Sequence, residues 1–377
     1  MNGTSAFSFL LKPLVRAAFA LFLVVSCSPA FAQEHEQLAG SNEVHGEEHA
    51  KKEFKAGELI MEHIGDSHDW HIVGHTHLPL PVILKTPGGW EFFSSSHLAH
   101  GEHYSGKYGT YALTEKNKMM VVDAAGSADE LATKAIIDFS LTKNAMTLLL
   151  CVTLMCVIFI GMARGYAKRG IAGPKGLASF LEPIIVFVRD DIAKNSIGEK
   201  HHMRFVPYLL TLFFFIWFLN LIGLIPIFPF GANVTGNIVT PLVLSTVTFL
   251  LVTLVAKWPY WRHMLAMPGI PIPVLIILTP IEIMGHFIRP FTLLIRLFAN
   301  IMAGHIVLLV FFCLIFIFSK NGDSLIGGFA TSPFALAFTI FINCLELLVA
   351  ALQAYVFTLL TSIYIGTAVA EPHHDHH

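Results

Sequence analysis

The chain has few charged residues and few cysteines. Asp, Glu, Lys and Arg make up 13% of its 377 residues, and the formal net charge is -2. This balance offers no basic surface to a nucleic acid and is too low in charge for a soluble chain. Of the five cysteines, none lies between residues 33 and 134, so a disulfide framework in that region is excluded.

Two further absences narrow the function. The chain lacks a GxxxxGK[ST] phosphate loop, so we expect no nucleotide site of that kind on this chain, and no cofactor. No internal repeat is visible, whereas secondary transporters are commonly built from repeats with broken helices. The lack of a repeat argues against a self-contained ion-coupled secondary transporter, which remains an alternative function for this chain.

Apolar residues are abundant instead. They make up 54% of the chain, which includes 32 Phe, and the mean hydropathy is +0.65. We predict an all-α polytopic membrane protein with five membrane helices, at residues 144–163, 205–228, 238–256, 274–319 and 332–369. Residues 176–198 have apolar positions at helical spacing opposite charged ones, which predicts one amphipathic interfacial helix. The last two spans would be roughly 70 and 60 Å long, so they must tilt or bend in a hydrocarbon core of about 30 Å.

The N-terminal part is predicted to be exported. Residues 1–32 read as a signal peptide that is cleaved after Ala32, or alternatively carries lipid on Cys27. Residues 33–134 are rich in histidine, disordered at first and then β-rich around a turn at residues 87–89. Residues 135–370 form the membrane domain, and residues 371–377 form a cytoplasmic tail.

Three of the histidines have the spacing of a strand face that could hold a metal: His71, His75 and His77. A metal-handling exported domain would use them, but no acidic or thiol partner is fixed beside them. We favour a solvated, histidine-tolerant surface and expect no metal.

Basic residues are distributed unevenly between the loops. One side of the predicted membrane region carries Arg164, Lys168, Arg169, Lys175, Arg189, Lys194, Lys200, Arg204, Lys257 and Arg262. The opposite loops contain only Lys320. The positive-inside rule then predicts a periplasmic N-terminus and a cytoplasmic C-terminus in a bacterial inner membrane.

Polar residues interrupt the last two spans. The first of these spans carries Glu282, His286, Arg289, Arg296, Asn300 and His305, and the second carries Asn343, Glu346, Gln353 and Tyr364. Helical spacing places much of each set on one face. Ionisable groups at such depth cost roughly 2.5–3.5 kcal/mol each and persist where they pair or line a wet path.

The two stripes suggest proton chemistry. His305 and Glu346 can exchange a proton near neutral pH, and the amides of Asn300, Asn343 and Gln353 can orient water. Arg296 stays charged, so it blocks direct proton passage and ionises a carboxylate brought to it. This chain supplies no mobile carboxylate, which implies that a partner does.

The segment LIRLFANIMAGH resembles the signature around the essential arginine in subunit a of F-type ATP synthases, and PYLLTLFFFIWFLNLIGLIP, FVRDDIAKNSIG and LELLVAALQAYVFTLLTSIY extend the resemblance. It implies that Arg296 faces a ring of c subunits. It further implies an outer half-channel using Asn300, His305, Glu346 and Gln353, and an inner one using Glu282 with His286. Ion flow would then drive rotation and ATP synthesis, with the b-subunit stalk and the rest of the F0F1 complex as partners.

Overall fold

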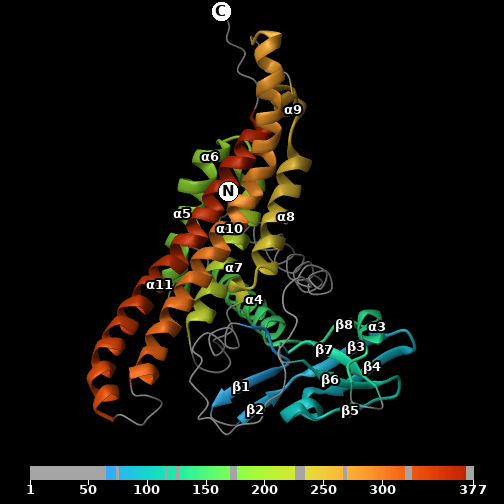
Figure 1. Ribbon diagram of the computed structural model, residues 1–377. Coiled ribbons are helices and arrows are strands. Elements are labelled where there is room, and N and C mark those ends of the chain that lie inside the picture. Colours follow the sequence, from blue (N-terminus) through green and yellow to red (C-terminus); the bar gives the residue numbers. More distant parts are fainter. Residues whose placement is uncertain are drawn as a thin grey trace, which may run out of the picture.

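The structure is a computed structural model that describes residues 65–73, 76–114, 117–123, 127–169, 176–225, 234–265, 270–318 and 325–370. The predicted signal peptide, Cys27, the predicted disordered segment and the C-terminal tail lie outside these ranges. Figure 1 shows the strands gathered at one end of a set of long helices. The predicted division into a β-rich N-terminal region and a helical remainder is confirmed.

The strands form three small antiparallel sheets. β1 (Asp69–Val73) pairs with β2 (Thr76–Pro79); β3 (Pro81–Thr86) lies between β4 (Gly89–Ser94) and β8 (Ile137–Asp138); and β6 (Thr110–Leu113) lies between β5 (Tyr104–Ser105) and β7 (Met119–Val122). The predicted turn joins β3 to β4, where Gly89 has a φ of 144°, a conformation that favours glycine.

The β-rich N-terminal region, which is predicted to be exported, has a small core between its sheets. Val82 and Leu84 of β3 pack with Leu98, Tyr111, Met119 and Ile136. The 3-10 helix η3 (Ser95–Gly101) and the short helix α3 (Glu130–Ala135) complete the region. Asp129 begins α3 by accepting hydrogen bonds from the backbone N–H groups of Leu131 and Ala132.

The helical region begins with α4 (Lys143–Arg169), α5 (Leu177–Phe187), the π-helical turn η4 (Val188–Lys194), α6 (Asn195–Ile197) and α7 (His202–Leu224). It continues with η5 (Val234–Gly236), α8 (Val239–Val255), α9 (Trp258–Leu265), α10 (Ile272–Phe318) and α11 (Leu325–Val369). The predicted interfacial helix is therefore α5 continued through η4 and α6.

Within the described residues, four helices are long and apolar enough to cross a membrane: α4, α7, α10 and α11. A fifth span is possible if α8 and α9, which meet at a bend of 101°, are counted together. These four or five candidate spans, two of them unusually long, confirm the predicted fold class. This is a multi-pass membrane protein.

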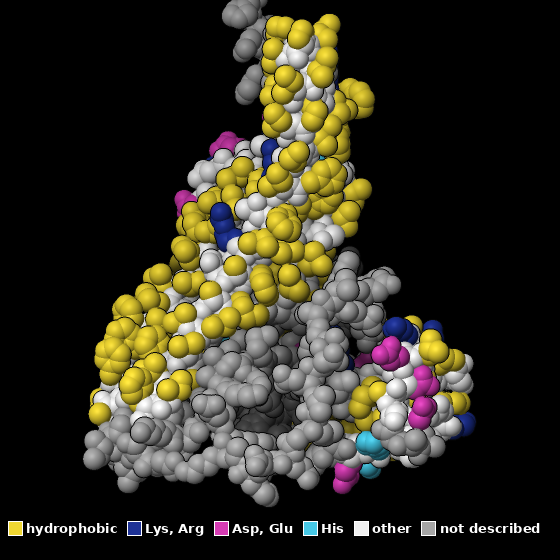
Figure 2. All heavy atoms as spheres, viewed as in Figure 1, with side chains coloured by type: hydrophobic (Ala, Val, Ile, Leu, Met, Phe, Trp, Pro, Cys, Tyr) yellow, Lys and Arg dark blue, Asp and Glu magenta, His cyan; other side chains and the backbone are white. Residues whose placement is uncertain are grey.

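Helix α7 lies at the centre, and α10 and α11 lie at the edge. In the most apolar stretch of α7, 78% of the residues are buried, compared with 22% in α10 and 17% in α11. Aromatic rings fill the contact of α7 with α4, where the Phe214 ring lies 4.9 Å from that of Phe159. Figure 2 shows hydrophobic side chains over most of the visible surface of the long helices, with isolated basic groups among them. The long helices thus leave a broad apolar face for lipid or partner subunits.

Candidate functional site

The polar side chains of α10 occupy both its buried and its exposed sides. His286 is buried, whereas Arg296 and Asn300, which lie one turn apart, are exposed on the outer side of the helix. Apolar or small side chains surround them on that face, including Phe291, Ile295, Ala299 and Ala303. An arginine on such an apolar face needs a partner that offers it a polar or anionic group.

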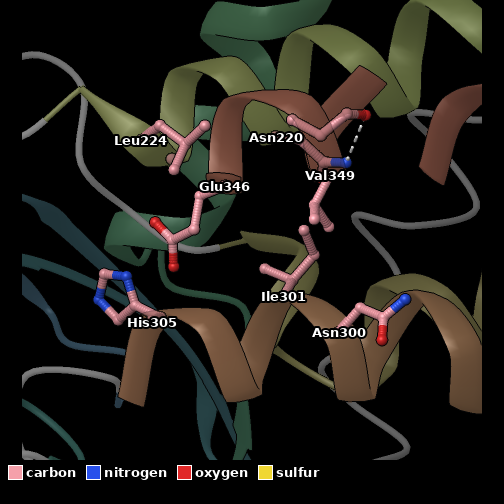
Figure 3. A pocket seen from close by; sticks show the side chains of 9 residues that line it. Asn220, Leu224, Asn300, Ile301, His305, Glu346 and Val349 are labelled. Carbon is pink, nitrogen blue, oxygen red and sulfur yellow. Dashed lines mark hydrogen bonds between the residues drawn. The ribbon is translucent and has the colours of Figure 1, made fainter. Parts of the chain in front are cut away.

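A cavity of about 30 Å³ lies between α7, α10 and α11. Its lining residues are Asn220, Gly223, Leu224, Asn300, Ile301, His305, Glu346, Val349 and Ala350. In Figure 3, the carboxylate of Glu346 on α11 and the ring of His305 on α10 point toward one another across it. Such a volume holds about one or two water molecules, which need polar partners of this kind.

Two buried polar atoms at this cavity have no hydrogen-bond partner among the described residues. They are Oε2 of Glu346 and Oδ1 of Asn220. The amide nitrogen of Asn220 donates to the backbone carbonyl of Ala350, at 3.4 Å, which fixes the side chain between α7 and α11 (Figure 3). A buried carboxylate oxygen without a protein partner is suited to a proton or a water molecule.

A second, smaller cavity of about 10 Å³ lies nearer the start of α10. It is lined by Thr248, Phe249, Val252, His286, Arg289, Pro290, Leu293 and Tyr364. The Nδ1 atom of His286 lies 2.9 Å from the hydroxyl of Tyr260, and that hydroxyl accepts a hydrogen bond from Arg289 at 3.4 Å. The tyrosine proton can therefore be donated to the imidazole, which links the cation, the phenol and the histidine in one chain of hydrogen bonds.

Arg296 lies between the two cavities along α10. At 1.5 Å per residue, it is about 10 Å beyond Arg289 and about 14 Å before His305. Protons can bind at either cavity, but the fixed positive charge between them opposes a direct transfer. The arrangement therefore provides two separate polar sites instead of one continuous polar pore.

The structure brings some of the predicted site residues together and leaves others apart. Asn300, His305 and Glu346 line the first cavity. Gln353 is buried two turns further along α11, whereas Asn343 is exposed and Glu282 is half-exposed one turn before His286, and none of these three lines either cavity.

Sequence reasoning missed Asn220, Tyr260 and the placement of Arg289 in the second cavity. Asn220 had a recognisable signal, because it is an amide within the otherwise apolar span 205–228. Tyr260 had none, because α9 has to fold back against α10 before its hydroxyl reaches His286.

The histidines considered for a metal are only partly described. His71 of β1 lies opposite His77 of β2 in the strand register, and His75 lies outside the described residues. Among the side chains that the structure describes, no three His, Cys, Asp or Glu residues are grouped so that they could hold a metal ion.

Comparison with known proteins divides the chain at the same place as its fold. Residues 59–139 match a family described as a domain of unknown function, DUF8433. Residues 145–366, more than half of the chain, match the family described as ATP synthase A chain.

Several bacterial relatives align with most of the chain. It is 36% identical to ATP synthase subunit a 2 of Chlorobaculum tepidum over 346 residues, covering 90% of this chain and 80% of the relative. It is 40% identical over 243 residues to ATP synthase subunit a of Chloroherpeton thalassium, covering 63% and 69%. A relative of the same name in Chlorobium phaeobacteroides is 35% identical over 313 residues, covering 80% and 87%. The chain belongs to the ATP synthase A chain family.

Proposed function

We propose that the chain is the proton-translocating stator subunit a of the F0 sector of an F-type ATP synthase. The observation that carries the proposal is the position of Arg296 on the exposed face of α10, between two cavities that contain titratable groups. Each cavity serves one half-channel, and the arginine separates them. Membership of the ATP synthase A chain family supports the same role.

The outer half-channel is assigned to the first cavity. A proton arriving there is shared by Glu346 and His305 through water, because a carboxylate beside an imidazole can exchange a proton near neutral pH. The amide of Asn300, which lines the cavity, orients that water. Gln353 lies further along α11 on the same path, and Asn343 lies nearer the end of the path that opens to the outside. The proton then passes to a carboxylate on a rotating c subunit.

The arginine makes this transfer directional. When a c-subunit carboxylate approaches Arg296, the positive charge favours its ionised form, so its proton is released to one side only. The second cavity, with His286 and the nearby Glu282, takes the proton on the cytoplasmic side. Rotation of the ring follows from repeated loading and release, and it drives ATP synthesis on other subunits or runs in reverse on hydrolysis.

The partners and orientation follow from the same assignment. The c ring packs on the exposed face of α10 and α11, which carries Arg296 and the outward residues Leu347, Leu348, Ala351 and Leu352. The b-subunit stalk and the rest of the F0F1 complex hold this chain against the ring. The excess of Lys and Arg in the loops on one side supports a periplasmic N-terminus in a bacterial inner membrane.

ATP-driven proton pumping tests the proposal. Inverted membrane vesicles containing the assembled complex are compared for the wild type, Arg296→Ala and the control Arg204→Ala, which removes an exposed arginine from the first turn of α7. We expect acidification to be lost only in Arg296→Ala, with the complex still assembled. Pumping that survives in Arg296→Ala would leave the arginine with a structural role and favour a self-contained transporter.

A further inference from the structure

Strand β4 of the sheet β4-β3-β8, in the exported region, has an inverted polarity. On β4, Trp90 and Phe92 point outward, whereas Glu91 between them is buried. Glu91 accepts hydrogen bonds from the hydroxyl of Tyr111 at 2.6 Å and from the backbone N–H of Lys107 at 2.5 Å, so its inward position is fixed by specific partners. The strand therefore keeps its acidic residue inside and shows its aromatic residues outside.

The neighbouring strands continue this outer face. In the strand register, Trp90, Lys85 and Ile137 form one row across the sheet. Ile83 lies opposite Phe92, and the backbone carbonyl of Ile83 accepts a hydrogen bond from Phe139, which places these two residues beside it. We call this surface the aromatic face; its members are Ile83, Lys85, Trp90, Phe92, Ile137 and Phe139.

The aromatic face is open to its surroundings. The exposed fraction is 52% for Trp90, 67% for Phe92, 40% for Ile137 and 43% for Phe139. An antiparallel sheet with one face on a core normally presents polar residues to water on the other face. Contiguous exposed apolar side chains of this kind indicate a surface that binds another protein or a membrane.

The aromatic face lies close in the chain to the start of the membrane helix α4. Phe139 lies four residues before Lys143, where the membrane helix α4 begins, so the two are at most about 14 Å apart along the chain. The segment around Asp66 ties the exported region to the same point, because a carboxylate oxygen of Asp66 accepts a hydrogen bond from the backbone N–H of Asn144. In Figure 1, β3 and β8 lie above β5 and β6, on the side of the exported region nearer the helices.

The composition of the face fits a membrane surface. Trp and Phe rings enter the boundary between headgroups and acyl chains, and the aliphatic stem of Lys lies along apolar surface while its charge reaches the phosphates. Here the Nζ atom of Lys85 lies 5.9 Å from the centre of the Trp90 ring. Lys85 is the one charged side chain among the outward residues of the three strands, and its sign matches anionic lipid headgroups.

We propose that the aromatic face rests on the lipid surface of the membrane that α4 enters, in the headgroup region. The exported region is then held by the lipid on one side and by the start of α4 on the other. This role does not depend on the proposed path of protons through α10 and α11.

Quenching of Trp90 fluorescence by lipid tests the proposal. The assembled complex is reconstituted in vesicles of phosphatidylcholine and phosphatidylglycerol whose acyl chains are brominated near the carbonyl end or at mid-chain. The difference between the emission of the wild type and that of Trp90→Phe isolates Trp90, and Phe keeps an aromatic ring on the strand. We expect this component to be lost with bromine near the carbonyl end and to be reduced less with bromine at mid-chain.

A tryptophan placed off the face provides the control. Ser105 of β5 is exposed, and β5 lies below β3 and β8 in Figure 1, on the side of the region away from the helices. Ser105→Trp in the Trp90→Phe background therefore reports on the same region away from the lipid. Its emission is expected to be unaffected by either brominated lipid. Trp90 emission that stays unquenched overturns the proposal: at short wavelength it means that another protein covers the face, and at long wavelength that water does.

Discussion

The position of the Glu346 carboxylate depends on Gly304 of α10. A Cβ atom built on Gly304 would lie 2.5 Å from the Oε1 atom of Glu346, which is too close for two non-bonded atoms. Glycine at this position lets α10 approach α11 while the carboxylate stays next to His305, one residue further along α10. The glycine of the segment that resembles subunit a is therefore explained here by space, not by backbone conformation.

Gly304→Ala should displace the Glu346 carboxylate from the first cavity. The carboxylate is the end of a flexible side chain and can move away from the added methyl group, so we expect proton exchange with His305 to slow about tenfold, which corresponds to about 1.4 kcal/mol in the barrier. Proton flow through the assembled complex at low driving force is the measurement. Gly285→Ala on the same helix is the control, because a Cβ there meets no atom within 4 Å. Equal rates in the two variants would contradict the packing argument.

Glu346→Gln tests the proton-binding role without a change of volume. An amide cannot take up and release a proton, so with His305 retained the delivery of protons from the outer side should fall on the order of 100-fold. The measurement is the rate of ATP synthesis at a limiting proton gradient. Cys344→Ala, at an exposed position on the same helix, should leave that rate unchanged. An unchanged rate in Glu346→Gln would remove the pair from the path.

Sequence reasoning found single residues wherever a polar group stood inside an apolar run. Arg296, His305 and Glu346 were conspicuous for that reason, because each is costly in a membrane unless it has a role. Their contacts were beyond reach, because Glu346 and His305 meet only when two helices pack in one register. Asn220 carries a weaker signal, because a single amide in a long apolar helix is also explained by an ordinary contact between helices.

At the scale of elements, the C-terminal part of α11 is fixed by close contact with η4 and α6. The hydroxyl of Ser362 donates to the backbone carbonyl of Ile192, and a Cβ on Gly366 would collide with the backbone carbonyl of Ser196. The contact joins the end of α11 to the helical segment that the sequence marked as amphipathic. It thereby sets the height at which Glu346 and Gln353 lie beside α10.

Gly366→Ala should therefore separate α11 from α6. A backbone carbonyl cannot move away as a flexible side chain would, so we expect a loss of about 1–3 kcal/mol in the free energy of unfolding and a lower melting temperature of the purified chain. Thermal unfolding in detergent is the measurement. The adjacent exposed residue provides the comparison, since Thr367→Ala should change the melting temperature little. Two variants with the same melting temperature would show that α6 yields to the added methyl group.

The long helices were the most predictable elements. Their apolar runs are longer than those expected of helices in soluble proteins. Helix α10 continues through Pro280 and Pro290, because neighbouring helices and side chains in a membrane protein can form hydrogen bonds with the carbonyl groups that the prolines leave free. The π-helical turn η4 and the fold-back of α9 were not predicted. Both depend on how η4 packs against α7 and α11 and on how α9 packs against α10 and α11, which the spacing of apolar residues does not reveal.

At the scale of the whole molecule, one short segment joins the β-rich N-terminal region to the membrane region. The backbone N–H of Lys143 donates to the carbonyl of Ser67, and its ammonium group donates to the carbonyl of Gly65. The Nε2 atom of His68 lies 3.0 Å from a carboxylate oxygen of Asp138, at the end of the aromatic face. The residues before β1 thus connect the start of α4 with β8.

The pair of His68 and Asp138 makes this connection sensitive to pH. Burial lowers the pKa of His68, but the hydrogen bond to Asp138 and the charges of Asp138 and Asp66 outweigh burial and raise it above its ordinary value. Burial raises the pKa of Asp138, but the hydrogen bond and charge of His68 outweigh this and lower it. The raised pKa of His68 stabilises the folded state fully below a pH of about 6.5, and this contribution is lost as the pH rises through the raised pKa. The lowered pKa of Asp138 acts in the opposite direction, because its contribution to stability is lost as the pH falls through that lowered pKa.

His68→Gln should remove this pH dependence, because glutamine can donate to Asp138 but does not titrate. In the wild type, amide hydrogen exchange at residues 137–146, corrected for the intrinsic effect of pH, should be slower near pH 6 than well above the raised pKa. The difference should disappear in His68→Gln and persist in His97→Gln, which changes an exposed histidine of the same region. If His68→Gln keeps the wild-type difference, another group controls the joint. If the difference is confined to residues 137–142, the β-rich N-terminal region loosens without any effect on the start of α4.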